Sequence, residues 1–204
     1  MTRGVRAPGS PLSFSGPKGT TMCVIETSPL IETRRMTLRA PTDVDAARIA
    51  EICSDREVAK MTARMPHPYA LENAFDWIAR AQGQDPRVER NFILDHEDEG
   101  PVGMLSLFPA QADGLGRGPG VELGYCVGRR WWGRGLATEA VQAALGWAKT
   151  RWKRRAVQAG HFEDNPASGA VLAKAGFLYT GERRPMFSVA RGEEASSRMM
   201  VWLA

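Results

Sequence analysis

Apolar residues recur along this chain with two different periods, which predicts a domain that mixes strands and helices. From Met36 to Ala40 every second residue is apolar, as in a half-buried strand that ends at Pro41. Positions 46, 49, 50 and 53 follow the helical period instead, after Thr42 and two acidic residues that suit the start of a helix. A second amphipathic helix is expected over residues 71–81.

The rest of the chain repeats this alternation. The clearest helical period runs over residues 137–152, where most of the inward face is alanine. A shorter helix is expected over 165–175, where Asn165 and Pro166 form a favourable start. The expected strands are 91–95, 102–108, 121–127, 157–162, a segment from 177 onward, and 198–203. This order predicts one α/β (α+β) domain, a sheet with helices on its faces.

Length and composition agree with a single domain of a cytoplasmic protein. The chain has 204 residues, of which 43% are hydrophobic, enough for one sizeable core. No apolar run reaches the ~18 residues of a membrane span, and no signal-peptide pattern opens the chain, so we expect no membrane partner. The three cysteines are widely spaced, which predicts neither a disulfide framework nor a metal site.

The positive charge is concentrated at the N-terminus. Of a net charge of +4, three units come from Arg3, Arg6 and Lys18 in residues 1–21, which contain no acidic residue. This segment is rich in Gly, Pro, Ser and Thr, so we expect a flexible basic tail. Met22 offers an alternative start, in which case the tail has no function. Because the remainder is nearly balanced in charge, we do not expect a nucleic-acid partner.

The stretch RRWWGRGLATEA, residues 129–140, places two glycines between a strand and the longest helix. Free backbone N–H groups at a helix start, together with the helix dipole, form a site for an anion. The phosphate-loop pattern GxxxxGK[ST] is absent because Leu136, Ala137 and Thr138 follow the second glycine. The other glycine-rich stretch, GLGRGPG at 114–120, precedes a strand and is interpreted as a mobile loop.

The spacing Arg130-x-x-Gly133-x-Gly135 resembles the acetyl-coenzyme A pyrophosphate loop of the GCN5-related N-acetyltransferase (GNAT) superfamily. WGRGLATEA is similar to the form found in the ribosomal-protein N-terminal acetyltransferase (RimJ/RimL-like) branch. Residues 32–61 resemble the opening strand and helix of that branch, and NPASGAVLAKAGF, residues 165–177, resembles its last helix. The resemblance covers an acetyltransferase domain of residues 32–203, with its motifs in the expected order.

The resemblance implies a mixed, largely antiparallel seven-stranded sheet whose central strands splay apart to admit the pantetheine arm of acetyl-CoA. It also implies that main-chain groups of the central strand bind pantetheine and that amides of the glycine turn bind the pyrophosphate. The implied cofactor-binding residues are Cys126, Val127, Arg130, Trp132, Gly133, Arg134, Gly135, Leu136, Ala137 and Asn165. The basic run RWKRR, residues 151–155, is explained by its position at a helix C-terminus, with a contact to the cofactor's 3′-phosphate as the alternative.

Acetyl transfer to an amine requires a deprotonated amine, a stabilised oxyanion and a proton for the leaving thiolate. Glu122 is the candidate base, because it opens the central strand on the face of Gly124 and Cys126; the alternative is a surface carboxylate paired with an arginine. By resemblance, Ser168 is the candidate acid, and the alternative is a serine bonded within its own helix. His161 on the adjoining strand is a second candidate base, or a core histidine.

These expectations define an N-acetyltransferase that acts by direct attack in a ternary complex, with a protein N-terminal amine as acceptor. Two alternatives stay open: a small amine such as a polyamine, amino acid or aminoglycoside, or a non-catalytic module that binds acyl-CoA. The acceptor groove is expected between residues 61–72 and 180–197, where an acidic pocket would favour a polycation. The protein is expected to be a monomer or homodimer.

Overall fold

The computed structural model describes Met1 and residues 29–110 and 120–204. The proposed tail, residues 1–21, and most of the 114–120 loop lie outside the described residues. The strands are β1 (Ile31–Glu32), β2 (Met36–Arg39), β3 (Arg90–His96), β4 (Gly100–Pro109), β5 (Val121–Val127), β6 (Ala156–Phe162), β7 (Leu178–Ser188) and β8 (Glu193–Leu203). The helices are α1 (Ala46–Ser54), α2 (Arg56–Ala59), α3 (Leu71–Gly83), α4 (Leu136–Thr150) and α5 (Pro166–Lys174), with single turns η1 (Asp43–Asp45) and η2 (Arg129–Trp131).

All described strands belong to one sheet in the order β1-β2-β3-β4-β5-β6-β8-β7. Within it, β5 and β6 run parallel and the other paired strands run antiparallel. The expected class is confirmed, but the expectation of seven strands was wrong, because the described sheet has eight. The additional strand, β1, has only two residues, too few to produce an alternating pattern.

The parallel contact in the centre of the sheet is very short. Its register joins Val121 to Val157 and Glu122 to Gln158, and no later residue of β5 is paired with β6. On its other edge β5 pairs with β4 along its whole length, from Val121 to Val127. The central strands therefore splay apart after Glu122, as the family resemblance implies, and leave one edge of β5 unpaired.

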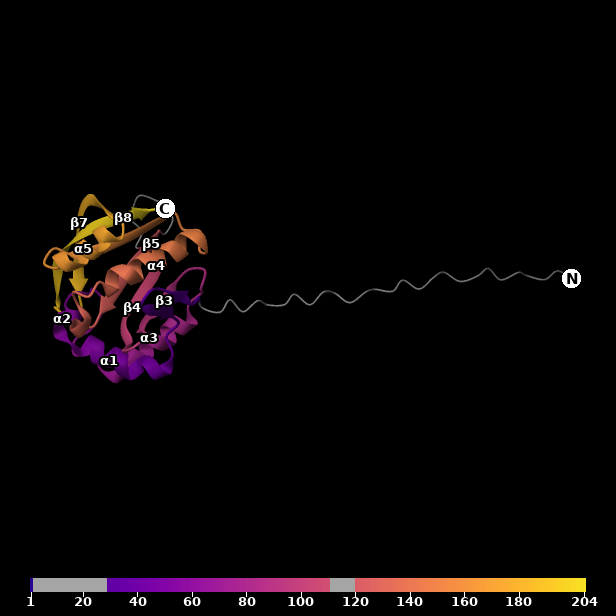
Figure 1. Cartoon of the computed structure of the whole chain (residues 1–204), viewed down its shortest axis with the longest axis horizontal. Coiled ribbons are helices and arrows are strands. Elements are labelled where there is room, and N and C mark those ends of the chain that lie inside the picture. The colour runs from indigo at the N-terminus through magenta and orange to yellow at the C-terminus, as the bar shows by residue number, and fades with distance from the viewer. Residues whose placement is uncertain (2–28, 111–119) are drawn as a thin grey trace.

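Helices cover both faces of the sheet. Figure 1 shows α1 and α3 on one side of the strands and α4 and α5 on the other. Ala140, Ala144 and Ala148 of α4 are completely buried, and their small side chains allow the helix to lie close to β5. Among the described residues, no helix combines the length and apolar character needed to cross a membrane.

The buried carboxylate of Asp45 connects β2 to the start of α1. Asp45 accepts hydrogen bonds from both terminal nitrogens of Arg39, at 2.9 and 2.7 Å, and from the backbone N–H of Thr42 at 2.8 Å. Arg39 also donates to Asp95 of β3 at 2.6 Å. Burial acts to raise the pKa of Asp45, but the hydrogen bonds from Arg39 and Thr42 outweigh it and hold the pKa below its usual value.

We expect Asp45→Asn to lower the free energy of unfolding by about 3 kcal/mol, because it leaves Arg39 partly buried without its main partner. Because the pKa of Asp45 is lower in the folded protein than in the unfolded chain, its stabilising effect is fully present at pH values above the unfolded-state pKa. The effect is lost as pH falls through the folded-state pKa. The difference between wild type and variant should therefore shrink in acid. Denaturant titrations against pH measure it, with exposed Asp43→Asn as control; an equal loss in both variants would contradict this explanation.

Candidate functional site

The turn that joins β5 to α4 has backbone geometry that suits glycine. Gly133 and Gly135 have φ values of +74° and +78°, in the left-handed region that other residues rarely adopt. A Cβ atom added to Gly133 would meet nothing within 4 Å, and one added to Gly135 would meet only a guanidinium nitrogen of Arg35, at 3.6 Å. The backbone of this turn is therefore accessible to a ligand.

Backbone donors at the start of α4 remain available. The first N–H bonded within the helix is that of Glu139, which donates to the carbonyl oxygen of Gly135 at 3.1 Å. The N–H groups of Leu136, Ala137 and Thr138 precede it and have no acceptor inside the helix. The helix dipole adds partial positive charge at the same point. Open backbone, free donors and positive potential together fit the pyrophosphate of a coenzyme A thioester.

Hydrogen bonds from Thr33 and Arg35, which sequence analysis did not predict, fix this turn. Arg35 donates from Nη1 to the carbonyl oxygen of Arg134 at 3.0 Å and from Nε to Glu139 at 2.8 Å. The other carboxylate oxygen of Glu139 accepts from Thr33 at 2.8 Å. Residues that precede β2 in the chain thus fix both the carbonyl of the turn and the first turn of α4.

The arginines of the turn share an acidic partner. Glu99, in the turn between β3 and β4, accepts hydrogen bonds from Arg130 at 3.0 Å, Arg134 at 2.8 Å and the indole of Trp131 at 2.7 Å. Donation from Arg134, Trp131 and Arg130 lowers the pKa of Glu99 to about 2. The charge that Arg130 and Arg134 offer an anion is therefore partly balanced before any ligand binds.

The two faces of β5 carry different chemistry. Tyr125 lies on the face of α4 and α5, where its hydroxyl is 2.9 Å from Oγ of Ser168. Burial raises the pKa of Tyr125 to about 12, against the effect of that hydrogen bond, so the phenol stays protonated. Asn165 caps α5 by accepting from the N–H of Ser168 at 3.1 Å. Ser168 therefore directs its hydroxyl at β5 across the splay, not back into its own helix.

Glu122 lies on the opposite face, three residues before Tyr125. It is directly opposite Phe108 of β4 in the strand register. Burial raises the pKa of Glu122 above its usual value, and the positive charges of Arg64 and Arg184 act in the other direction. The candidate base and the candidate acid are thus on opposite sides of the sheet, both beside the point where β5 and β6 separate.

The remaining predicted residues have defined partners. The carbonyl oxygen of Val127 accepts from the indole of Trp132 at 2.6 Å, so one main-chain group of the proposed pantetheine edge is already engaged. The thiol of Cys126 is hydrogen-bonded to Cys53 of α1, a contact that, with burial, raises the pKa of Cys53. Among the described residues, no group of His, Cys, Asp and Glu side chains is arranged to hold a metal ion.

His161, the second candidate base, has both ring nitrogens occupied. Nδ1 is 2.8 Å from the carbonyl oxygen of Phe162 and must carry the hydrogen, because a carbonyl only accepts. Nε2 then accepts from the hydroxyl of Tyr179 at 3.0 Å. Since His161 is also buried beneath α5, this geometry fits a hydrogen-bonded core histidine.

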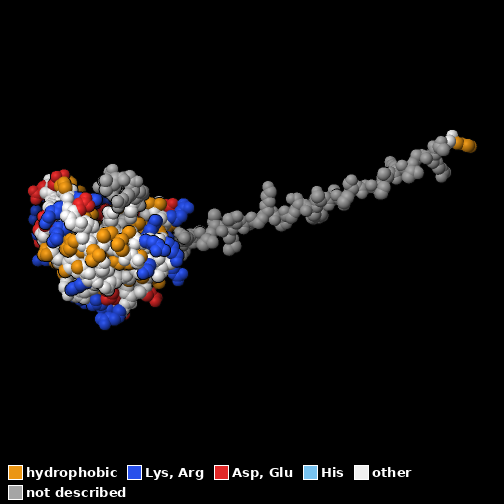
Figure 2. Space-filling view, turned by 90° about the horizontal axis from the view of Figure 1, so that it is seen from above, with side chains coloured by type: hydrophobic (Ala, Val, Ile, Leu, Met, Phe, Trp, Pro, Cys, Tyr) orange, Lys and Arg blue, Asp and Glu red, His pale blue; other side chains and the backbone are white. Residues whose placement is uncertain are grey.

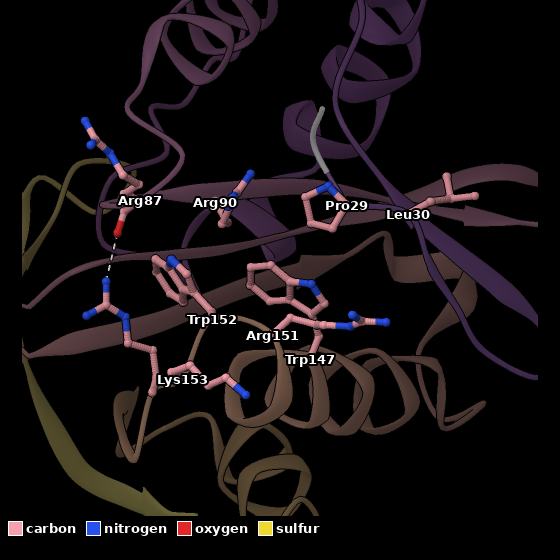
Figure 3. Close-up of a pocket in the computed structure, with 9 residues that line it drawn as sticks. Pro29, Leu30, Arg87, Arg90, Trp147, Arg151, Trp152 and Lys153 are labelled. Atoms are coloured by element: carbon pink, nitrogen blue, oxygen red, sulfur yellow. Dashed lines mark hydrogen bonds between the residues drawn. The ribbon is translucent and has the colours of Figure 1, made fainter. Parts of the chain in front are cut away.

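The basic run 151–155 lies at the far end of α4, about 22 Å from the glycine turn along a helix of this length. It contributes to a hollow of about 670 Å³ that also contains Arg87, Arg90 and Trp147 (Figure 3). Figure 2 shows Lys and Arg side chains gathered on the surface near the start of the described domain. The hollow is separate from the glycine turn. The position of residues 151–155 at a helix C-terminus therefore explains their charge better than a contact with the cofactor's 3′-phosphate does.

Comparison with known proteins identifies the class that this fold and turn define. The family described as "Acetyltransferase (GNAT) domain" matches residues 35–178, more than half of the chain. The chain belongs to this family and is an acetyl-CoA-dependent N-acetyltransferase.

Individual relatives agree with this assignment. The uncharacterized N-acetyltransferase YoaA of Bacillus subtilis is 29% identical over 158 residues, 76% of this chain and 86% of the relative. The ribosomal protein uS5 alanine N-acetyltransferase of Escherichia coli is 36% identical over 59 residues, 29% of this chain and 30% of that enzyme. The solved spermidine N-acetyltransferase of Vibrio cholerae, with CoA and spermine, has a TM-score of 0.67 at 17% identity and covers 83% of this chain and 95% of its own.

We expect Gly135→Val to abolish stabilisation by acetyl-CoA, because a β-branched side chain disfavours the left-handed backbone of this turn and would press on the guanidinium of Arg35, which displaces the amides of α4. In the wild type, ligand at about 100 times its Kd should stabilise the fold by about 2.7 kcal/mol, which thermal melts detect. Gly192→Val is the control for backbone strain, since Gly192 has a φ of +72° and open surroundings in the β7–β8 turn. If Gly135→Val keeps the full ligand-induced shift, the cofactor binds elsewhere.

Proposed function

We propose that the protein transfers an acetyl group from acetyl-CoA to the N-terminal amine of a protein. The observation that carries the proposal is the placement of Glu122 and Ser168 on opposite faces of β5, at the edge where pairing with β6 ends. A donor entering from the α4 and α5 side and an acceptor entering from the other side would meet in the splay. The similarity to an enzyme named for a ribosomal-protein alanine supports a protein N-terminus as acceptor.

The chain holds the donor mainly through its backbone. The free amides of residues 136–138 would bind the pyrophosphate, and the unpaired edge of β5 at Cys126 and Val127 would lie along pantetheine. The bound thioester supplies an activated acetyl group. Because Glu99 balances part of the charge of Arg130 and Arg134, the amides and the dipole of α4 would supply much of the attraction for the anion.

The acceptor face supplies a base. An N-terminal amine is largely protonated near neutral pH and must lose its proton before it attacks. Glu122 would take that proton, directly or through a water molecule. Burial that raises its pKa makes the carboxylate a stronger base than an exposed glutamate, and the nearby positive charges keep it ionised.

On the donor face, Ser168 would give a proton to the leaving thiolate sulfur and regain one from solvent before the next turnover. Tyr125 is a positioning residue that sequence analysis missed: if its phenol donates to Oγ of Ser168, the serine's own hydrogen is free to point away from Tyr125. A cytoplasmic location would suit this reaction, and the two cysteines that the structure describes, Cys53 and Cys126, are free thiols.

The test is release of thiol from acetyl-CoA with a panel of N-terminal peptides, spermidine, amino acids and aminoglycosides. The proposal predicts the highest kcat/KM with peptides and mass spectrometry that places the acetyl group on the α-amine. A preference for small amines would identify the second candidate function. Binding of acetyl-CoA without turnover of any acceptor would favour a non-catalytic module.

Glu122→Gln should lower kcat/KM by about 10²-fold and replace its acidic limb by one that follows the pKa of the acceptor amine. In the wild type, activity requires the ionised carboxylate, so kcat/KM should rise with pH through a pKa above the usual 4.5. A pH series of initial rates measures this, with exposed Glu193→Gln as control. An unchanged acidic limb in Glu122→Gln would assign the base to another group.

Ser168→Ala should lower kcat with little change in acetyl-CoA affinity, because the hydroxyl helps most once charge develops on sulfur. Tyr125→Phe should lower kcat less, by about 10-fold at most, and the double variant should be no slower than Ser168→Ala. Rates and calorimetric affinities for the three variants measure this. If the losses of kcat in the two single variants multiply in the double variant, Tyr125 does not act through Ser168. If Ser168→Ala weakens acetyl-CoA binding and leaves kcat unchanged, Ser168 is a binding contact.

A further inference from the structure

Arg64, in the segment between α2 and α3, lies on the same face of the sheet as Glu122. Its guanidinium carbon is 4.3 Å from the ring centroid of Phe108. Phe108 is directly opposite Glu122 in the β4–β5 register, and its ring lies 3.2 Å from the position a Cβ of Gly124 would occupy. The Phe108 ring therefore covers the Glu122 and Gly124 face of β5, with Arg64 stacked on it.

The segment that carries Arg64 is fixed by the hairpin of β7 and β8. Oγ of Ser188 donates to the carbonyl oxygen of Thr62, and the N–H of Val189 donates to that of Ala63, both at 3.0 Å. Arg191 reaches the carbonyl of Lys60 at 2.7 Å. The backbone next to Arg64 is thus held by a neighbouring element, and the cation has a defined place.

The positive charge of Arg64 acts on Glu122 but is not held in an ion pair with it. Within the described part of the chain, Arg64 makes no hydrogen bond or ion pair and is exposed to solvent. Arg184 of β7 also acts on Glu122, but it pairs with Glu182. An acceptor that brings its amine to Glu122 therefore meets, on the same face, an arginine that is available for an anion.

We propose that Arg64 is an anion-binding subsite for the acceptor, and that preferred acceptors carry a carboxylate close to the reacting amine, as in a protein whose second or third residue is acidic. This inference rests on the proposed function and names the acceptor class within it. A polyamine would bring its second ammonium next to the same guanidinium, so like-charge repulsion disfavours it. Sequence analysis expected the acceptor groove between residues 61–72 and 180–197 but did not predict the sign of the charge there.

The experiment compares peptides that begin Ala-Asp, Ala-Asn and Ala-Lys and are otherwise identical. The wild type should prefer Asp over Asn by about threefold to fivefold in kcat/KM, the range of an exposed ion pair, with Lys the poorest. The preference should decline with added salt. Arg64→Gln should remove it and Arg64→Glu should reverse it, while Arg151→Gln, an exposed arginine at the far end of α4, should leave it unchanged.

A second set of acceptors separates this inference from the proposed function. It contains 4-aminobutyrate, butylamine and 1,4-diaminobutane, which have similar length and different charge. If only these small amines react, the proposed function fails, and preference for the anion still supports the subsite. Calorimetric binding of both sets to the enzyme saturated with CoA should follow the same order without turnover. The inference would be overturned if anionic, neutral and cationic acceptors reacted or bound equally well, or if cationic acceptors were preferred. It would also be overturned if the preference for the Ala-Asp peptide survived Arg64→Gln.

Discussion

The short parallel contact between β5 and β6 is the constraint on which the site depends. Parallel neighbours need a crossover, and here the crossover consists of η2, the glycine turn and α4. The same connection that makes the strands neighbours therefore places the N-terminal end of α4 beside their separation. After two residue pairs the strands diverge, and Tyr125 bridges the gap to α5 through Ser168. The positions of the glycine turn, the strand separation and Ser168 therefore all depend on the crossover from β5 to β6.

Charge is divided between the two faces of the sheet. On the α4 side, Glu99 balances the arginines of the turn, and Arg35 with Glu139 fixes its backbone, so the site offers oriented amides more than mobile cations. On the α1 side, Glu122 is largely buried opposite Phe108, and the positive charges of Arg64 and Arg184 act on it. In the proposed function, the donor side would therefore hold a phosphate through backbone groups, and the acceptor side would take up a proton and bind one further charge.

Local patterns in the sequence were sufficient for most of the fold and for the position of the glycine turn at the start of α4. The alanine face of α4, the alternation of β5 and the pair Gly133 and Gly135 each depend on neighbours a few positions away. The functional pairings that were missed join distant positions: Tyr125 and Ser168 are 43 residues apart, and Arg35 and Arg134 are 99 apart. No periodicity encodes such contacts, and β1 and α2 were missed because they are too short to show one.

In the proposed function, acetyl-CoA and the acceptor occupy opposite sides of the splay at the same time, with direct transfer between them. Initial rates measured over a matrix of acetyl-CoA and peptide concentrations test this most directly. Direct transfer in a ternary complex predicts double-reciprocal lines that intersect. Parallel lines would indicate an acetylated enzyme formed before the acceptor binds, as expected if Cys126 were a nucleophile, and would contradict the account.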